Sequence, residues 1–368
     1  MRSVLALLAL AASALAVPVE SNNDVLKRNI LKRQSVTSGA DDVTVLNFAL
    51  TLEHLENVFY SDALKKFNAT SFADAGYDGL YLVLQQVAKD EAAHVEFLTT
   101  ALSAAGATPV QACNYSFPYT DVASFLALSQ VIEGVGVSAY LGAAGSINTT
   151  AYLTAAASIL TVEARHAAAL QFIHNYQPAP APNDTPLSAS AVVTLVSPFF
   201  TSCPTGSAPT IEGNTALNVT TAAPAIGQSL QLTPANSSAT EGVDTVYCGF
   251  ASGLSAGFST YSNGACDIPS QNITAGQTYV LLTSGPSIAD SSILAGPAIL
   301  TLGEANLTVF NTSSSSSAGG SNKSSTGSSG SMGSGSGSAS GGSNGAATTK
   351  FGFAGVAAAV VGALALVV

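Results

Sequence analysis

Long runs of apolar residues at helical spacing occupy the first half of the chain. Between residues 41 and 177, apolar positions recur every three or four residues, with few glycines or prolines to interrupt them. At 1.5 Å per residue, helices of about 25 residues would be roughly 37 Å long. The pattern predicts four such helices, at 43–67, 78–105, 120–145 and 149–176. Long helices joined by short connections are typical of an antiparallel four-helix bundle.

Smaller signals refine this helical half. Thr120 and Asp121 are candidate N-caps of the third helix, because side-chain oxygens at that position accept hydrogen bonds from free backbone N–H groups. A short fifth helix is expected near 188–196. We therefore place the helical bundle at 40–205.

The pattern changes after Cys203. Short runs of β-forming residues, such as 229–233, 245–250 and 278–282, alternate with Gly, Pro and Asn. These runs predict a small β-sandwich-like domain at 206–311. The fold class is thus mainly α, with a β region after the bundle, and the β region shows no motif of its own for chemistry.

The N-terminal segment predicts a targeting signal. Residues 1–16 contain a basic residue, an apolar run too short to span a bilayer and a small-residue cleavage site, as in a secretory signal peptide. Residues 17–33 contain two dibasic pairs and are either a processed propeptide, which we favour, or an unstructured basic linker. In the favoured case the mature chain begins at Gln34.

The C-terminal segment predicts a membrane attachment. Residues 312–350 are rich in Ser and Gly, which is typical of a disordered stalk. Residues 351–368 form an apolar tail without charges, and no Lys or Arg follows it. Small residues, a spacer and such a tail are typical of a GPI-attachment signal, with Asn344 preferred and 341–343 competing. We expect a secreted, extracellular protein that is GPI-anchored to the outer leaflet of the plasma membrane or passed to the cell wall.

Composition agrees with an extracellular location. The expected mature chain, residues 34–344, keeps 5 basic and 20 acidic residues, which excludes nucleic acid as a partner. The sequence also contains ten sequons for N-glycosylation. These are Asn68, Asn114, Asn148, Asn183, Asn218, Asn236, Asn272, Asn306, Asn311 and Asn322.

Four cysteines in an oxidising compartment predict two disulfides. Three pairings are open. We prefer Cys113–Cys203 with Cys248–Cys266, because each bridge then stays near one domain.

Two of the predicted helices carry Glu and His three residues apart on their apolar faces. These are Glu91 and His94 on the second helix, and Glu163 and His166 on the fourth. On a helix such a pair projects side by side, so the two side chains can chelate one metal ion.

The first and third helices supply a matching carboxylate each. Glu53 and Glu133 lie on apolar faces, and Tyr60 and Tyr140 follow them by seven residues, two turns along the same face. A tyrosine there can donate a hydrogen bond to a ligating carboxylate. Glu56, one turn after Glu53, is an alternative ligand, but it has no tyrosine seven residues later.

The two halves of the bundle repeat this pattern. Glu53 and Tyr60 recur as Glu133 and Tyr140 at one constant offset along the chain, and the Glu91–His94 pair recurs as Glu163 and His166 at another. Two hairpins related by a pseudo-twofold axis, each giving Glu and Glu-x-x-His, form the ligand set of dimetal carboxylate bundles. Four buried carboxylates in one bundle also require cations, because burying an unpaired charge costs several kcal/mol.

Four further charged or titratable residues lie in the predicted helices. Asp90 and Arg165, beside the ligand pairs, are either hydrogen-bonding partners of the ligands or solvated charges. His54 and His174 are expected at the surface or in structural positions.

These motifs resemble those of the secreted fungal ferritin-like domain proteins known as stress-response or late sexual development proteins. The resemblance covers roughly 40–205. The segments that carry it are 52–56, 59–60, 90–94 and 163–166, with 186–188 and 198–203 after the bundle. It implies a secreted, metal-binding ferritin-like domain with a role in stress or development. It implies no particular reaction, because the fold hosts many.

The first hypothesis for function is a cell-surface protein that holds two iron or manganese ions. Mixed carboxylate and imidazole ligands favour Fe or Mn over Zn or Cu. Such a site can react with O2 or peroxide, so ferroxidase-like or peroxide-scavenging activity is expected.

The alternative is a non-catalytic GPI-anchored protein of cell-wall structure or adhesion, with a structural or vestigial metal site. A hydroxylase or desaturase would need a reductase partner. Catalysis and oligomeric state stay open.

Overall fold

The structure is a computed structural model that describes residues 41–175 and 177–303. The expected signal peptide, propeptide, stalk and C-terminal tail lie outside the described residues, together with Asn344. So do three of the sequons, Asn306, Asn311 and Asn322.

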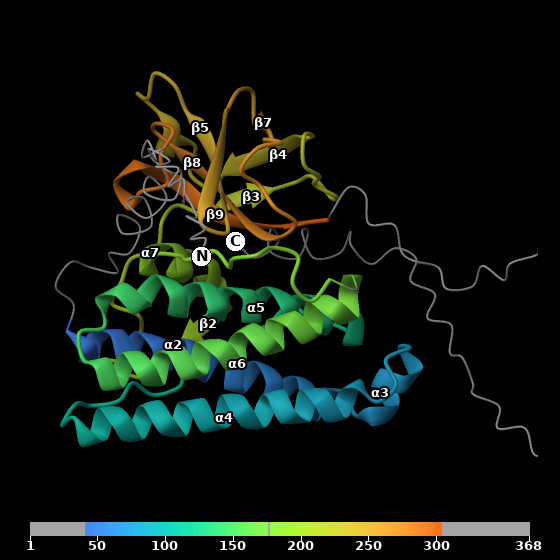
Figure 1. Cartoon of the computed structure of the whole chain (residues 1–368), viewed down its shortest axis with the longest axis vertical. Helices are drawn as coiled ribbons and strands as arrows, with labels where there is room; N and C mark the ends of the chain where they lie inside the picture. The colour runs from blue at the N-terminus through green and yellow to red at the C-terminus, as the bar shows by residue number, and fades with distance from the viewer. Residues whose placement is uncertain (1–40, 176, 304–368) are drawn as a thin grey trace, which may run out of the picture. The chain divides into compact units, whose positions relative to one another are not determined.

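Four long helices form a bundle of two antiparallel hairpins (Figure 1). The first hairpin pairs α2 with α4, and the second pairs α5 with α6. The bounds are α2 (Asp42–Lys66), α4 (Leu80–Ala104), α5 (Val122–Ala143) and α6 (Thr150–Asn175). Each helix begins and ends within two residues of the predicted bounds, so the predicted bundle is confirmed.

Side-chain caps fix where α2 and α5 begin. The Asp41 carboxylate accepts a hydrogen bond from the Thr44 backbone N–H at 2.8 Å at the start of α2. Asp121 accepts from the Ser124 N–H at 2.8 Å, and the Ser124 hydroxyl accepts in turn from the Asp121 N–H at 3.1 Å. Of the two candidate caps of α5, Asp121 is therefore the cap.

Shorter elements connect the long helices. Helix α3 (Ala69–Asp74), which the sequence pattern did not predict, begins at an Asn68 capping box. The expected short helix is α7 (Ala189–Val196), and the 3-10 turn η2 (Ser197–Phe199) follows it directly. Another 3-10 turn, η1 (Ala144–Ser146), follows α5. Strands β1 (Asn114–Tyr115) and β2 (Phe200–Ser202) pair antiparallel, beside a Cys113–Cys203 disulfide.

Residues 217–302 form two small antiparallel sheets, as predicted for the β region. One sheet has the order β3 (Leu217–Val219), β4 (Ser229–Pro234), β7 (Ala265–Asp267). The other has the order β6 (Ser255–Thr260), β5 (Tyr247–Ser252), β8 (Gly276–Thr283), β9 (Ile293–Leu302). The turns η3 (Ser237–Thr240) and η4 (Asp290–Ser292) lie between strands. The Cys248–Cys266 disulfide joins the two sheets, so both bridges have the preferred pairing.

Strand β8 is buried on both faces. Val280 and Leu282 pack in the core between the sheets, whereas Tyr279 and Leu281 belong to the core of the bundle. The Tyr279 hydroxyl donates to the Gly134 carbonyl of α5 at 3.1 Å. The β region therefore packs directly on α5 and shares its hydrophobic core.

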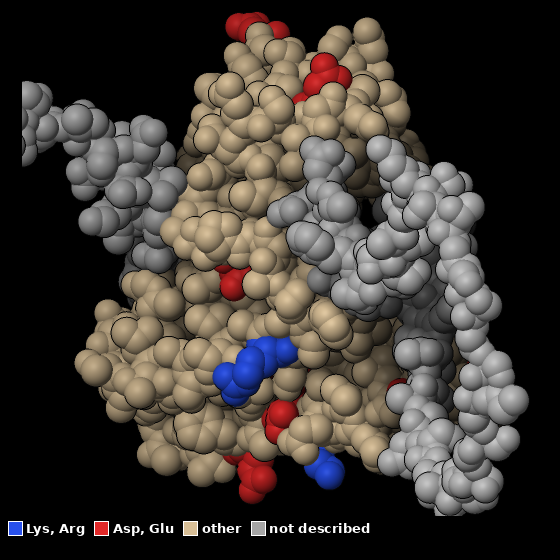
Figure 2. All heavy atoms as spheres, turned by 45° about the vertical axis from the view of Figure 1, so that its right-hand side comes forward, with Lys and Arg blue, Asp and Glu red and all other residues tan. Residues whose placement is uncertain are grey.

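Helix α5 is rich in apolar residues and is buried on nearly every side. With η1 it spans Val122–Ser146, the one described helix long and apolar enough to cross a membrane, and 83% of its most apolar window is buried. That burial is expected of a central core helix. The face of the described chain that is seen in Figure 2 carries few charged side chains.

Candidate metal centre

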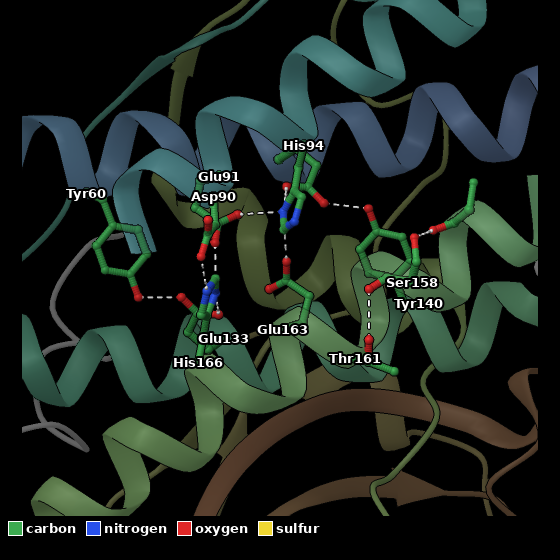
Figure 3. Close-up of polar contacts among 12 residues, drawn as sticks. Tyr60, Asp90, Glu91, His94, Glu133, Tyr140, Ser158, Thr161, Glu163 and His166 are labelled. Atoms are coloured by element: carbon green, nitrogen blue, oxygen red, sulfur yellow. Dashed lines mark hydrogen bonds and ion pairs between the residues drawn. The ribbon is translucent and has the colours of Figure 1, made fainter. Parts of the chain in front are cut away.

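The six predicted ligands converge inside the bundle (Figure 3). The four glutamates are 0% exposed, and His94 and His166 are 8% and 7% exposed. Each long helix contributes through the face that it turns to the other three. The contributions are Glu53 from α2, Glu91 and His94 from α4, Glu133 from α5, and Glu163 and His166 from α6.

The ligand atoms form two overlapping groups. The first contains Glu53, Glu91, His94 and Glu163, and the second contains Glu91, Glu133, Glu163 and His166. Within each group the ligand atoms lie within 4.8 Å of one another. Glu91 and Glu163 belong to both groups. Two adjacent sites that share two carboxylates are the arrangement that a pair of bridged metal ions needs.

Each histidine presents its Nδ1 atom to several carboxylates. His94 Nδ1 lies 3.2 Å from Glu53 Oε2, 3.3 Å from Glu91 Oε2 and 3.2 Å from Glu163 Oε1. His166 Nδ1 lies 2.9 Å from Glu91 Oε1 and 3.4 Å from Glu133 Oε2. A ring nitrogen carries at most one proton, so hydrogen bonds alone cannot satisfy all these oxygens.

Several of these buried atoms have no hydrogen-bond partner among the described residues. They are Glu91 Oε1, Glu133 Oε2, both carboxylate oxygens of Glu163, and His166 Nδ1. His166 Nδ1 and Glu91 Oε1 are close, but they are not aligned as donor and acceptor. Buried polar atoms without partners are costly. A divalent cation in each group would satisfy them, so the donor set fits a metal pair.

Two tyrosines fix the outer carboxylates across the bundle. Tyr60 of α2 donates a hydrogen bond to Glu133 Oε1 of α5, and Tyr140 of α5 donates to Glu53 Oε1 of α2. Each tyrosine thus holds the glutamate of the opposite hairpin. In both carboxylates Oε2 is left for the cluster, because the hydroxyl occupies Oε1.

Burial and mutual repulsion set the charges of the site. Burial, with the nearby Glu163 charge second, raises the pKa of Glu91 to about 7. Burial also raises the pKa of Glu163 and of Glu133.

The histidines respond in the opposite sense. Burial alone would lower the pKa of His94, but the nearby carboxylates of Glu163, Glu53 and Glu91 outweigh burial and raise that pKa to about 12. For His166 the same balance, with Glu133 and Glu91 as partners, raises the pKa to about 11. Without metal, the two imidazolium groups therefore supply the positive charge inside the cluster.

The other charged or titratable residues near the ligands have different surroundings. Asp90 Oδ2 lies 3.3 Å from His166 Nε2, so Asp90 can orient this ring from outside the cluster. Arg165 is exposed, as a solvated charge is. His54 donates from Nε2 to the Val110 carbonyl at 3.0 Å, which is a structural contact. The side chain of His174 lies outside the described residues.

The sequence treats Glu53 and Glu56 as alternatives, but the structure buries both. Glu53 belongs to the first ligand group, whereas Glu56 belongs to neither. Glu56 is 3% exposed, and burial together with the charge of Glu163 raises its pKa well above the ordinary value. Its spacing of three residues from Glu53 was a signal that both share one helix face.

Comparison with known proteins identifies part of the chain. Residues 41–175 match the family model of the ferritin-like domain. Among solved structures, the chain is similar to a conserved hypothetical protein, rv2844, from Mycobacterium tuberculosis, with 19% identity and a TM-score of 0.32. That match covers 37% of this chain and 99% of the other. No curated protein matches the chain.

Proposed function

We propose that this chain, whose residues 41–175 form a ferritin-like domain, holds two iron or manganese ions and uses them in redox chemistry with O2 or peroxide. One observation carries the proposal. Two groups of buried ligand atoms share Glu91 and Glu163, and each group also has a carboxylate and an imidazole of its own. Oxygen-rich ligand sets of this kind favour Fe or Mn.

The residues divide the work between the two positions. Glu53 and His94 would hold one ion, and Glu133 and His166 the other, with Glu91 and Glu163 between them. Two such ions, when bound, exchange electrons with O2 or peroxide, as in a ferroxidase or a peroxide scavenger. Tyr60 and Tyr140 keep the outer carboxylates oriented, and the packed bundle excludes bulk water from the cluster.

We further propose that the protein is secreted, glycosylated and GPI-anchored at the cell surface. The terminal sequence signals support this location. Six sequons with exposed Asn side chains support glycosylation: Asn68, Asn114, Asn148, Asn183, Asn236 and Asn272. The resemblance to the secreted fungal proteins supports a role in stress response or sexual development.

Metal content tests the proposal. The full chain is expressed, and the purified protein is analysed by inductively coupled plasma mass spectrometry beside Glu91→Gln/Glu163→Gln. We expect about two Fe or Mn ions per chain, as in dimetal carboxylate bundles, and their loss from the double variant. The matched control is Glu96→Gln/Glu212→Gln, which removes two exposed carboxylates and should keep the ions.

Two further measurements complete this test. Fe²⁺ oxidation by O2 or peroxide should accompany metal binding in the parent protein and be absent in the double variant. Release from cells by a phosphatidylinositol-specific phospholipase C tests the anchor. A folded protein that is metal-free and takes up neither added iron nor manganese would contradict the proposal and leave the structural or adhesion role.

A further inference from the structure

We propose that Glu56 is a seventh metal ligand, which serves one ion of the pair and makes the two metal positions unequal. The inference rests on the proposed function, because it concerns the same pair of ions. In this proposal Glu53 and Glu56 are both ligands, rather than alternatives for one position.

The repeat between the two hairpins breaks at this position. The offset that takes Glu53 to Glu133 and Tyr60 to Tyr140 takes Glu56 to Gly136. The first hairpin therefore has a carboxylate where the second has no side chain. A ligand at this place can exist on one side of the pseudo-twofold axis only.

Gly136 is also the residue that gives Glu56 its space. A methyl group at Gly136 would lie 2.8 Å from Glu56 Oε1 and 3.2 Å from Glu163 Oε2. The two carboxylates therefore approach each other over the bare backbone of α5. An alanine there would displace Glu56 first, because its oxygen is the nearer of the two.

Among the described residues, Glu56 is surrounded by apolar side chains and one further carboxylate. It borders a cavity of about 20 Å³ that none of the six ligands lines and whose other lining is apolar, including Leu55, Val131 and Val196. On the cluster side stands Glu163, which is 0% exposed and whose two oxygens have no hydrogen-bond partner among the described residues. A carboxylate buried between an apolar cavity and another carboxylate is stabilised by an ion that both can bind.

Stepwise binding of Mn²⁺ tests the role of Glu56. Calorimetric titration of the metal-free full chain should show two binding steps of unequal affinity. Glu56→Gln keeps the size of the side chain and should weaken one step by about 10–100-fold or more, because it removes a ligand. The other step and the final number of ions should stay unchanged.

Two further variants separate a ligand from a merely buried acid. Gly136→Ala leaves Glu56 in the chain but displaces its carboxylate, so it should weaken the same step. Glu96→Gln removes an exposed glutamate from α4 and should change neither step. If Gly136→Ala does not fold, a crystal structure of the Mn²⁺-loaded protein decides, with Glu56 oxygen at about 2.0–2.4 Å from one ion as expected for a ligand.

The outcomes distinguish this inference from the proposed function. If the parent protein binds two Mn²⁺ ions and Glu56→Gln binds both with unchanged affinity, Glu56 is not a ligand and the dimetal site stands. If the parent binds neither Mn²⁺ nor Fe²⁺, the proposed function itself is wrong. Weakening of both steps equally would also overturn the inference, since Glu56 would then act on the whole cluster.

Discussion

At the scale of single residues, the tyrosine hydroxyls decide which oxygens of the outer carboxylates face the cluster. Tyr140 occupies Glu53 Oε1 and Tyr60 occupies Glu133 Oε1, so that both carboxylates are held from behind. The orientation is set across the hairpins. Loss of one hydroxyl therefore releases a ligand that belongs to the other half of the bundle.

Tyr60→Phe should weaken metal binding by about 10–100-fold, the usual effect of removing a partner that orients a ligand. The phenyl ring keeps the packing with Phe59 and Phe125, so folding should be retained. Competition with a fluorescent chelator measures the affinity. Tyr261→Phe, in the β region, removes a distant hydroxyl as a control, and an equal loss there would contradict the assigned role of Tyr60.

Stability of the metal-free protein should fall as the pH rises from about 5 to 9. Glu91 has a pKa of about 7 in the folded chain against an ordinary value of 4.5, and His94 and His166 have values of about 12 and 11 against 6.5. In each case the folded state binds more protons than the unfolded state, Glu91 between pH 4.5 and 7 and the histidines above 6.5. Raising the pH therefore favours unfolding.

Urea unfolding with a chelator at pH 5, 7 and 9 measures this dependence. Saturating Mn²⁺ should reverse it, because ligand deprotonation favours metal binding as the pH rises. In Glu91→Gln/Glu163→Gln the dependence should flatten, since two carboxyls of the cluster are gone. A midpoint that rises with pH in the chelator would show that the histidines are not charged in the metal-free fold.

The six ligands could be predicted because each lies on an apolar stripe at helical spacing, and because the spacing occurs twice. Glu56 has the same spacing and burial, yet sequence alone could not assign it. Its place depends on Gly136, which is distant in the sequence and on another helix. A pattern along one helix does not contain that contact.

At the scale of elements, α5 is organised by its glycines. An added methyl group would overlap the Gln277 side chain at Gly134 and the Leu187 carbonyl oxygen at Gly142, and it would lie 2.8 Å from Glu56 at Gly136. Glycine weakens a helix by about 1 kcal/mol relative to alanine. In α5 that weakness is offset by three close approaches, to β8, to α2 and to the segment before α7.

Gly142→Ala should destabilise the fold by about 1–3 kcal/mol, as overpacking does, despite the better helix propensity of alanine. The obstacle is backbone rather than a flexible side chain, so it cannot move aside. Urea midpoints measure the change. Gly285→Ala, which meets nothing within 4 Å, is the control and should unfold within about 0.5 kcal/mol of the parent. A stabilised Gly142→Ala would mean that α5 and the Leu187 segment are farther apart.

Long helices were predictable to within two residues, but several short elements were not. Helix α3 has 6 residues and β7 has 3, so neither shows a periodic pattern. Their existence depends on an Asn68 cap and on pairing with β4 respectively. The cap is a single local contact, whereas the pairing of β7 with β4 is a long-range contact, which overrides weak local preferences.

At the scale of the whole molecule, β8 couples the β region to the metal centre. Tyr279 and Gln277 contact α5 at Gly134, next to the ligand Glu133, while Val280 and Leu282 hold the two sheets together. The β region carries no ligand of its own among the residues that the structure describes. It supports the helix that carries one.

Thermal unfolding should therefore show one transition for the bundle and the β region together. Metal binding should raise the midpoint temperature of this single transition. At a free metal concentration about 100 times the dissociation constant, each site should add about 2.7 kcal/mol to the free energy of unfolding. Tyr279→Ala should remove the hydrogen bonds to α5 and separate the transition into two. Differential scanning calorimetry measures both, and two transitions in the parent protein would contradict this coupling.

The tyrosine bonds between the hairpins also determine when an ion can first be captured. The ligands of the first group span residues 53–163 and those of the second span 91–166. Each outer carboxylate is also oriented by a hydroxyl of the opposite hairpin. The nascent chain therefore has no complete site until both hairpins have been synthesised. Metal uptake is therefore a late event, after the bundle has closed. If the protein is secreted, as proposed, the ions available in the secretory compartment, rather than those at the ribosome, would decide which metal it carries.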